Sequence, residues 1–235
     1  MKRNLSLILL MIAALAIFSI ASCGGSNDRE VATKAASEDL KQYAQVDDYE
    51  NDAYNVYEEK TVTTFKPFPI YTDGRSPDNH YVASGYMGDY SDIKVENSHF
   101  DNPHAGSTSI QIVYNNKASQ GARWCGIYWQ NPANNWGDRQ GGYDLTGAKK
   151  LTFWARGKKG GERVEEFKVG GISGLYPDSD LAGIGPVLLT PEWKQYEIDL
   201  RGKDLSYISG GFAWATNLDV NPEGATFYLD DIRYE

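Results

Sequence analysis

Cysteine is almost absent, since the 235 residues contain only Cys23 and Cys125. Cys23 directly follows an N-terminal leader and is expected to carry lipid, which leaves Cys125 without a partner for an intrachain disulfide. Two cysteines also exclude a metal cluster built from cysteine ligands. The three histidines all precede Cys125 in loop-like sequence, so we expect its thiol to be a small buried hydrophobe and not a nucleophile.

A block of basic residues is missing as well. Without residues 1–22 the chain has 21 Lys and Arg against 32 Asp and Glu, a net charge of −11. A polyanion of this kind is a poor partner for nucleic acid or for anionic lipid headgroups. The same charge disfavours acidic polysaccharides, although a local patch of Arg and Lys could override it.

The one long hydrophobic run lies at the N-terminus, over residues 5–20. Lys2 and Arg3 precede it, and small residues follow it up to Cys23. The run is short and ends in a processing site, so residues 1–22 are predicted to be a signal peptide and not a transmembrane helix. The alternative at Cys23 is an ordinary signal peptide that has a cysteine there by chance.

The residues around Cys23, Ile-Ala-Ser-Cys, resemble the bacterial lipobox. The resemblance implies a lipoprotein whose Cys23 carries palmitate or a similar acyl chain and attaches the protein to a membrane. Gly24 stands where an acid would favour retention in the inner membrane, so the outer membrane of a bacterial envelope is the expected location. Residues 23–60 are polar and acidic, which predicts a flexible spacer after the lipidated N-terminus.

Helical periodicity is absent from residues 61–235. Short β-rich segments recur there instead, separated by Gly, Pro, Asn and Asp. The pattern predicts one all-β domain, a sandwich or a barrel, with enough residues for its own core. The expected strands are 62–71, 80–87, 93–96, 108–114, 123–129, 150–156, 164–169, 187–189, 194–200, 211–216 and 226–234.

Aromatic and charged side chains mark one candidate face. Alternation along residues 150–156 places Trp154 and Arg156 opposite the apolar row that contains Phe153. The same argument places Glu166 and Lys168 together on one side of the segment 164–169. If these strands share a sheet, its outer face is a surface on which a flat polar ligand can stack. The predicted face consists of Trp124, Tyr128, Trp154, Arg156, Glu166 and Lys168, and a buried structural role for Trp154 remains open.

A polar loop over residues 131–142 carries Trp136. A loop of this length that contains a tryptophan either binds a ligand or packs the indole back against the fold. We therefore count Trp136 as a candidate for ligand binding, with capping of the sandwich as the alternative.

Three motifs resemble galactose-binding-like jelly rolls of bacterial carbohydrate-binding modules. They are the connector 143–148 with the strand 150–157, the segment 191–200, and the final segment 226–233 with its Asp-Asp pair. The resemblance implies a jelly-roll β-sandwich over about residues 65–235. It also extends to a domain type found in complex I assembly factors, which is not primarily a sugar binder.

Such modules often hold a structural calcium ion near the last strand, where Asp230 and Asp231 stand in this sequence. Adjacent residues of a strand point to opposite faces, so at most one of them would be a ligand unless the backbone bulges. No cofactor is otherwise expected. No two acids are marked out as a glycosidase pair, because that chemistry needs one carboxyl with a raised pKa at a fixed distance from the other.

The favoured function is non-catalytic binding of a polysaccharide or oligosaccharide by a lipid-anchored envelope protein. The first alternative is a structural or protein-interaction domain of an envelope assembly that has no sugar site. A glycoside hydrolase or polysaccharide lyase is the second alternative. The identity of the glycan, the membrane leaflet and the oligomeric state stay open at this point.

Overall fold

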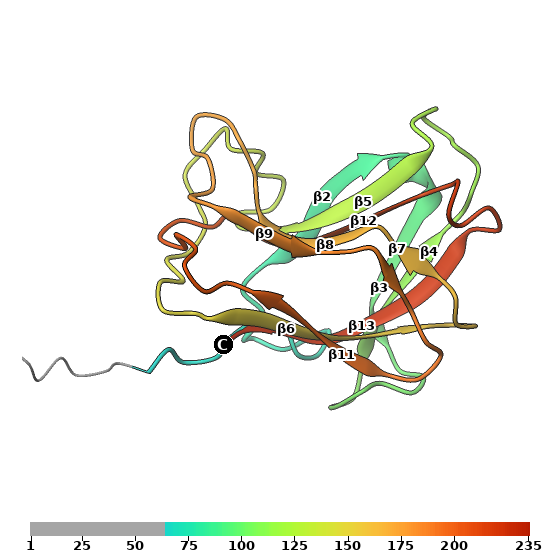
Figure 1. The fold of residues 1–235 in the computed structure, drawn as a ribbon, viewed down its shortest axis with the longest axis horizontal. Helices are drawn as coiled ribbons and strands as arrows, with labels where there is room; N and C mark the ends of the chain where they lie inside the picture. The colour runs from blue at the N-terminus through green and yellow to red at the C-terminus, as the bar shows by residue number, and fades with distance from the viewer. Residues whose placement is uncertain (1–63) are drawn as a thin grey trace, which may run out of the picture. The chain divides into compact units, whose positions relative to one another are not determined.

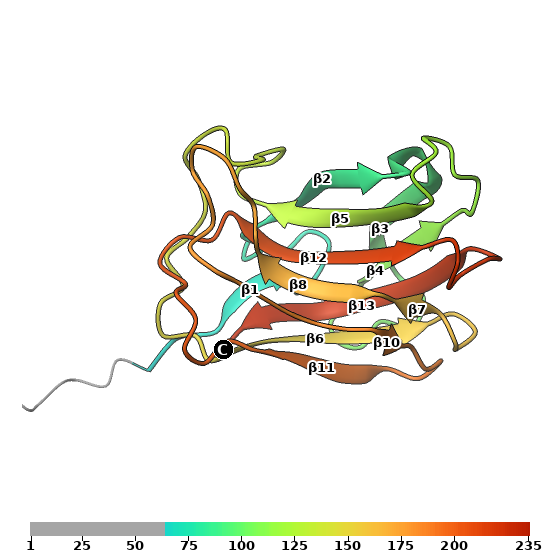
Figure 2. The same cartoon turned by 45° about the horizontal axis from the view of Figure 1, so that its top comes forward.

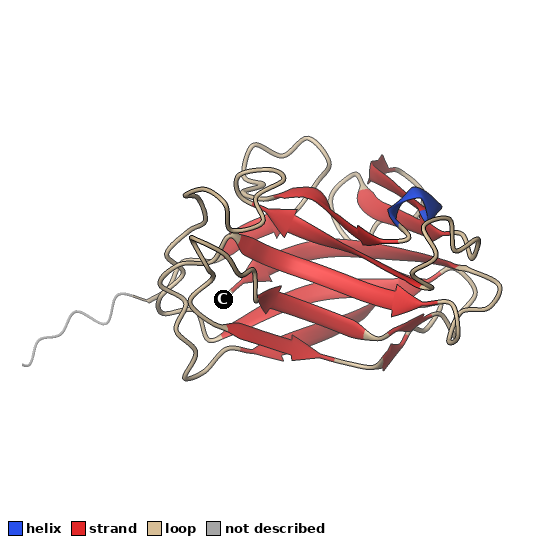
Figure 3. Cartoon of the chain, turned by 90° about the horizontal axis from the view of Figure 1, so that it is seen from above, coloured by secondary structure: helices blue, strands red, loops and turns tan. Residues whose placement is uncertain are grey.

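The computed structural model describes residues 64–235, which form one compact unit built from antiparallel strands. The predicted signal peptide, the lipidation site Cys23 and the predicted spacer 23–60 lie outside the described residues. Within 64–235 the single helical segment is the short turn η1 (Tyr90–Asp92), drawn in blue in Figure 3. No helix in this part of the chain is long and apolar enough to cross a membrane.

Two main sheets lie face to face as the layers of a sandwich (Figures 1 and 2). The six-stranded sheet has the order β11–β6–β13–β4–β3, and β1 pairs with the C-terminal part of β13. Its strands are β1 (Phe68–Tyr71), β3 (Ile93–His99), β4 (Ser109–Tyr114), β6 (Lys150–Gly157), β11 (Lys194–Asp199) and β13 (Ala225–Tyr234).

The five-stranded sheet has the order β2–β5–β12–β8–β9. Its strands are β2 (Val82–Gly88), β5 (Trp124–Gln130), β8 (Glu166–Gly170), β9 (Leu181–Ile184) and β12 (Gly210–Asn217). A small separate pair, β7 (Arg163–Val164) with β10 (Val187–Leu188), completes the strands.

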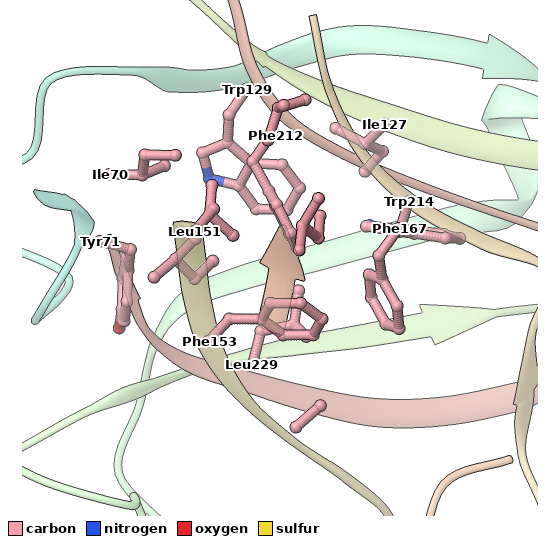
Figure 4. Packing of buried hydrophobic residues seen from close by; sticks show 14 of the residues in the cluster. Ile70, Tyr71, Ile127, Trp129, Leu151, Phe153, Phe167, Phe212, Trp214 and Leu229 are labelled. Atoms are coloured by element: carbon pink, nitrogen blue, oxygen red, sulfur yellow. The ribbon is translucent and has the colours of Figure 1, made fainter. Parts of the chain in front are cut away.

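The core fills the space between the two sheets. Period-2 alternation turns Phe153 of β6 inward from one sheet and Phe212 of β12 inward from the other, with their ring centroids 5.2 Å apart. Trp214 meets Phe227 edge to face across the same space, at 5.0 Å. Figure 4 shows Phe153, Phe212 and Trp214 packed together in this space. Full burial of each such side chain stabilises the fold by about 1.5–3 kcal/mol, so the apolar row of each strand determines which face it turns inward.

The expected strands are found in the structure, with one addition. Every predicted segment overlaps an observed strand, and the prediction of an all-β sandwich is confirmed. The segment 164–169 is interrupted at Glu165 between β7 and β8, and β9 was not predicted because Leu181–Ile184 is short and contains a glycine. Cys125 is fully buried in β5, and burial raises the pKa of its thiol, which confirms its expected role as a small hydrophobe.

Candidate functional site

The residues of the predicted face lie on two different sheets. Trp154 and Arg156 are on β6 of the six-stranded sheet, whereas Glu166 and Lys168 are on β8 of the five-stranded sheet. The expectation that these four cluster on one outer face is therefore wrong. Alternation determined correctly which side of each strand the residues occupy, but it carries no information about which strands become neighbours.

The outer face of the five-stranded sheet contains a strip of small side chains. Gly126 of β5 lies opposite Ala215 of β12, and Ala213 lies one pleat further along β12. We call Gly126, Ala213 and Ala215 the small-residue floor. Residues paired from strand to strand form two rows across this part of the sheet. The first row consists of Gly85, Tyr128, Ala213, Lys168 and Gly183. The second row consists of Met87, Gly126, Ala215 and Glu166.

Tyr128 lies at one end of this floor and is almost fully covered. Its exposed fraction is 4%, its hydroxyl donates to the Gly170 carbonyl at 3.0 Å, and burial raises its pKa. The Trp136 ring stands edge to face on it, with centroids 6.0 Å apart and planes at 86°. Tyr128 was expected to be a surface platform, and the structure makes it the support beneath Trp136.

Trp136 is 43% exposed at the rim of the same face, on the loop 131–142. Asn135 holds this loop from inside, because its backbone carbonyl accepts from Gln130 Nε2 at 2.7 Å and its side chain donates to the Arg139 carbonyl at 3.0 Å. The loop therefore presents the indole in a fixed position. Of the two roles considered for Trp136, packing and exposure for binding, the structure shows features of both.

A second loop, 171–180, stands beside the first at the same end of the sheet (Figures 1 and 2). The Tyr176 amide donates to the Gly137 carbonyl at 2.9 Å. Gly137 has a φ of 84°, and a Cβ there would run into the Ser173 carbonyl oxygen, so this close approach of the two loops requires glycine.

Asp178 anchors the second loop and was not singled out from the sequence. Its carboxylate accepts the amide of Ile172 at 3.0 Å and the hydroxyl of Ser209 at 2.7 Å. It thereby connects the end of β8 to the start of β12, and Ile172 packs on Tyr128. The sequence around Asp178 has no feature that separates it from other loop acids.

Polar groups line the other side of the floor. Lys168 Nζ lies 5.2 Å from the Tyr128 ring centroid and 3.4 Å from Glu166 Oε2. Burial would lower the pKa of Lys168, but its contacts with Tyr128 and Glu166 raise it above the usual value, so the side chain is a cation at neutral pH. A shallow depression of about 360 Å³ beside Glu166 is lined by Glu165, Glu166, Gly183, Ile184 and Gly185.

Trp124 is the second exposed indole of this face, with an exposed fraction of 42%. It alternates with the buried Cys125 and so shares a side of β5 with Gly126 and Tyr128. Tyr128 lies four positions further along the strand, a span of about 13 Å. Asn217 of β12 lies directly opposite it. The face thus has one exposed indole near each end and the small-residue floor between them.

Trp154 is on the other sheet and is half-buried. His104, from the loop between β3 and β4, stacks on its ring with centroids 3.7 Å apart and planes at 16°. The Nδ1 atom of His104 lies 3.0 Å from Asp231 Oδ2. The alternative of a structural role for Trp154 therefore describes its surroundings better than an open stacking platform does.

Asp230 and Asp231 sit at a bulge in β13, contrary to the expectation for a regular strand. Asp231 has a φ of 45°, and the register with β6 shifts between Asp230 and Arg233. Both carboxylates consequently face His104: Asp230 Oδ2 accepts the amides of His104 at 2.9 Å and Ala105 at 3.3 Å. A backbone bulge was the condition under which both acids could serve one site, and the structure satisfies it.

These carboxylates nevertheless do not fit a calcium ion. A calcium site needs six to eight oxygen ligands, and here backbone N–H groups already occupy the Asp230 oxygens. Among residues 64–235 no group of three or more His, Cys, Asp or Glu side chains is placed to hold a metal. The bulge is held together by hydrogen bonds within the protein.

We therefore expect calcium to leave the thermal stability unchanged. A ligand that binds only the folded state raises the melting temperature by mass action, so its addition and its removal are both visible. Thermal unfolding followed in millimolar calcium and in excess chelator should give the same midpoint. A midpoint that rises by several degrees with calcium, but not with magnesium, would contradict this expectation.

Asp230 should also give the stability a pH dependence. Burial raises the pKa of its carboxyl to about 6, although the amides of Ala105, Asp231 and His104 oppose the shift. The folded chain then holds this proton more tightly than the unfolded chain. The resulting stabilisation is complete below pH 3.8 and is lost as the pH rises to about 6.

Replacement of Asp230 with Asn should remove this dependence. Over the interval from about pH 4 to pH 6.5, the wild-type protein should lose roughly 2–3 kcal/mol of unfolding free energy relative to Asp230→Asn. Urea unfolding at a series of pH values measures both profiles, with His104→Gln as the control for the neighbouring imidazole. Parallel profiles for wild type and Asp230→Asn would show that Asp230 is not the responsible group.

Comparisons with known proteins agree on the fold. No family model and no curated protein matches this sequence. A crystal structure of a family 30 carbohydrate-binding module superposes with a TM-score of 0.50 at 15% identity, over 72% of this chain and 98% of that module. The described residues have the fold of a carbohydrate-binding module. The expected jelly-roll β-sandwich is confirmed.

Two further solved structures are similar at lower scores. Another crystal structure of a family 30 module gives a TM-score of 0.48 at 16% identity, over 72% of this chain and 87% of that chain. The family 30 module of a cellulosomal cellulase of Clostridium thermocellum gives 0.47 at 15% identity, over 72% and 97%. The superposition with a TM-score of 0.50 at 15% identity establishes the fold alone, so the ligand has to be argued from the residues of this chain.

Proposed function

We propose that this protein binds a glycan, without acting on it chemically, on the outer face of the five-stranded sheet. The observation that carries the proposal is the pair of exposed indoles, Trp124 and Trp136, placed near opposite ends of the small-residue floor. Exposed tryptophans are costly in water unless they pack or bind. The surface between them is apolar: Met87 packs with Tyr128, Ile172 and Ala213 and lies against Gly126.

The chemistry of the face suits a sugar chain. Aromatic rings stack on the apolar C–H face of a pyranose, while charged and amide side chains form hydrogen bonds with its hydroxyl groups. Glu166, Lys168 and Asn217 supply donors and acceptors beside the floor. A span of about 13 Å along β5 exceeds the width of one sugar ring, so the proposed ligand is an oligosaccharide or polysaccharide.

A hydrolase or lyase is less well supported. Glycoside hydrolysis needs a carboxyl whose pKa is raised, at a fixed distance from a second carboxyl on the same ligand-binding surface. Among residues 64–235 the carboxyl with a resolved upward shift of its pKa is Asp230, and it is fully buried on the other sheet beneath His104. An envelope interaction domain without a sugar site is the remaining alternative, and direct binding measurements separate it from our proposal.

The test is a binding screen with soluble neutral polysaccharides. The chain without its first 23 residues keeps every described residue and lacks the lipidation site. In affinity electrophoresis we expect retardation by at least one β-glucan, mannan or xylan, and calorimetry with the matching oligosaccharide then gives the Kd. If no neutral glycan of a broad array is bound, the proposal fails and the interaction-domain alternative gains support.

We also propose that the protein is a lipoprotein of the bacterial cell envelope, attached through Cys23, and that the outer membrane is its location. The support comes from the leader and the lipobox-like residues before Cys23. Attachment through a flexible segment would leave the binding face free to reach glycans outside the membrane.

Replacement of Cys23 with Ser should abolish attachment. The variant cannot be acylated at this position, so we expect it either to leave the membrane fraction or to accumulate with its leader uncleaved. Fractionation with immunoblotting measures both outcomes, and Ser22→Ala provides a matched control that keeps the cysteine. A Cys23→Ser protein that is cleaved normally and still sediments with membranes would refute the lipoprotein proposal.

A further inference from the structure

The outer face of the six-stranded sheet contains a buried cation with few partners. Arg156 is 8% exposed, and its guanidinium carbon lies 3.8 Å from the Tyr228 ring centroid and 5.2 Å from that of Trp193. Its Nη2 donates to the Asp101 carbonyl at 3.4 Å, and its buried Nε has no hydrogen-bond partner. The arginine ion pairs within 64–235 are formed by Arg123, Arg163, Arg201 and Arg233. Arg156 thus has no carboxylate partner in the described part of the chain.

This arrangement is unusual because a buried charge is normally paired and a buried polar group is normally hydrogen-bonded. The Tyr228 ring fixes the plane of the guanidinium and stabilises the cation, but it does not replace acceptors for the N–H groups. The acids near this strand do not supply them either: the buried Glu162 lies against the neighbouring Gly157, and its Oε2 has no hydrogen-bond partner. Asp101 offers only its backbone carbonyl, and Asp230 and Asp231 are bound to His104 and its neighbours.

Two further cations lie on the same outer face as Arg156, Lys158 close to it in sequence and Lys94 three strands away, about 14 Å across the sheet. Lys158 follows Arg156 by two residues, just after the end of β6, and its amide donates to the Thr226 carbonyl. Thr226 pairs with Val113 of β4, and Val113 pairs with Lys94 of β3. Both lysines are exposed, and neither forms an ion pair with another described residue. The three cations together with Trp193 form what we call the Arg156 patch.

The acid in the same row as Arg156 is exposed and has a histidine as its hydrogen-bond partner. Glu96 stands across Gln111 at the edge strand β3, 3.3 Å from His99 Nδ1. On a chain whose net charge is −11 without its leader, the Arg156 patch is a local concentration of unpaired positive charge. It is the kind of patch that would override the general repulsion of an acidic ligand.

We propose that the Arg156 patch is a second binding site, which takes an acidic saccharide. A guanidinium presents a planar fork of N–H groups that matches a carboxylate or a sulfate. Trp193 is held beside it by a hydrogen bond from its Nε1 to the Asn102 carbonyl at 3.0 Å. An aromatic ring next to an arginine fits a ligand that combines a sugar ring with an anionic group. Nucleic acid or an anionic membrane would need a larger basic surface. The site lies on the sheet opposite the neutral-glycan face and does not depend on it.

The test compares acidic and neutral ligands on the chain without its first 23 residues. Affinity electrophoresis at low ionic strength uses polygalacturonate, a sulfated polysaccharide and a neutral glucan, and calorimetry uses galacturonate oligosaccharides. Arg156→Gln should weaken binding of the acidic ligand about tenfold to a hundredfold, as expected for loss of charge-assisted hydrogen bonds. Binding of a neutral glycan should be unchanged.

Because Arg156 is buried, its replacement could disturb the fold, so a second variant is needed. Lys94→Ser with Lys158→Ser changes only exposed residues and should weaken binding of the acidic ligand while leaving the melting temperature unchanged. Lys149→Ser changes an exposed lysine just before the start of β6, at the other end of that strand from Lys158; it is the matched control and should bind like the wild type.

Three results would overturn this second site. The first is that neither acidic polysaccharide binds. The second is that inorganic sulfate binds as tightly as the acidic oligosaccharide, and the third is that anionic lipid vesicles bind while the acidic saccharides do not. The Trp124→Ala, Trp136→Ala double variant should retain acidic binding. Failure of the neutral-glycan proposal and failure of this one are therefore distinguishable.

Discussion

Removal of both exposed indoles, in a Trp124→Ala, Trp136→Ala double variant, should nearly abolish binding of a neutral glycan while leaving the fold intact. Each stacking aromatic contributes on the order of 1–3 kcal/mol, by analogy with bases stacked on aromatic platforms. The two rings lie near opposite ends of the floor, so their contributions should add to roughly 2–6 kcal/mol. Calorimetry with the oligosaccharide found in the screen measures the loss.

The controls for this variant come from the same chain. Both tryptophans are more than 40% exposed, so the melting temperature should change little. Phe100→Ala removes an aromatic ring that is 74% exposed on the loop after β3 of the other sheet, and it should bind neutral glycan like the wild type. Retention of affinity in the double variant would place the neutral-glycan site elsewhere.

The Tyr128→Ala variant should lose about 3–5 kcal/mol of unfolding free energy, which is the range for deletion of a large buried aromatic side chain. The ring supports Trp136, packs on Ile172 and lies beneath Lys168, and its exposed fraction is only 4%. Its removal leaves a cavity under both the loop and the polar edge of the floor. Glycan affinity should fall as well, because Trp136 loses its support.

The Tyr128→Phe variant is the matched control. It keeps the ring and loses only the hydrogen bond to the Gly170 carbonyl, so we expect a loss of about 1 kcal/mol of stability and unchanged glycan affinity. Denaturant unfolding with calorimetry on the same samples separates stability from binding. Full stability of Tyr128→Ala together with a large loss of binding would instead make Tyr128 a direct stacking residue, as the sequence had led us to expect.

The candidate site could be predicted only in part. The outward position of Trp124 and Trp136 was predictable, since alternation places Trp124 opposite the apolar Cys125 and Trp136 lies in a polar loop. The position of Trp136 over Tyr128 was not predictable, because it depends on the contact of two loops through Gly137. Asp178, which fixes the second loop, is recognisable only once Ser209 and Ile172 are seen around it.

From the residues alone one can predict every strand except β9, the inward row of each regular strand, and the side of the strand on which each candidate residue lies, apart from Asp230 and Asp231 at the bulge in β13. These properties are local: a period of two, combined with the gain from burying apolar side chains, decides them within a few neighbouring residues. Phe153 faces inward and Trp154 faces outward for this reason alone.

Which outward faces belong together depends on the pairing of distant strands and could not be predicted. Strand neighbours are chosen by contacts between segments far apart in the chain, such as β6 with β13 and β8 with β12, and the period of two is the same whichever neighbour a strand has. Tertiary structure therefore separated Trp154 and Arg156 from Glu166 and Lys168. It turned one predicted face into two surfaces of different chemistry: a floor of small residues between exposed indoles on one sheet, and a guanidinium without a carboxylate partner on the other.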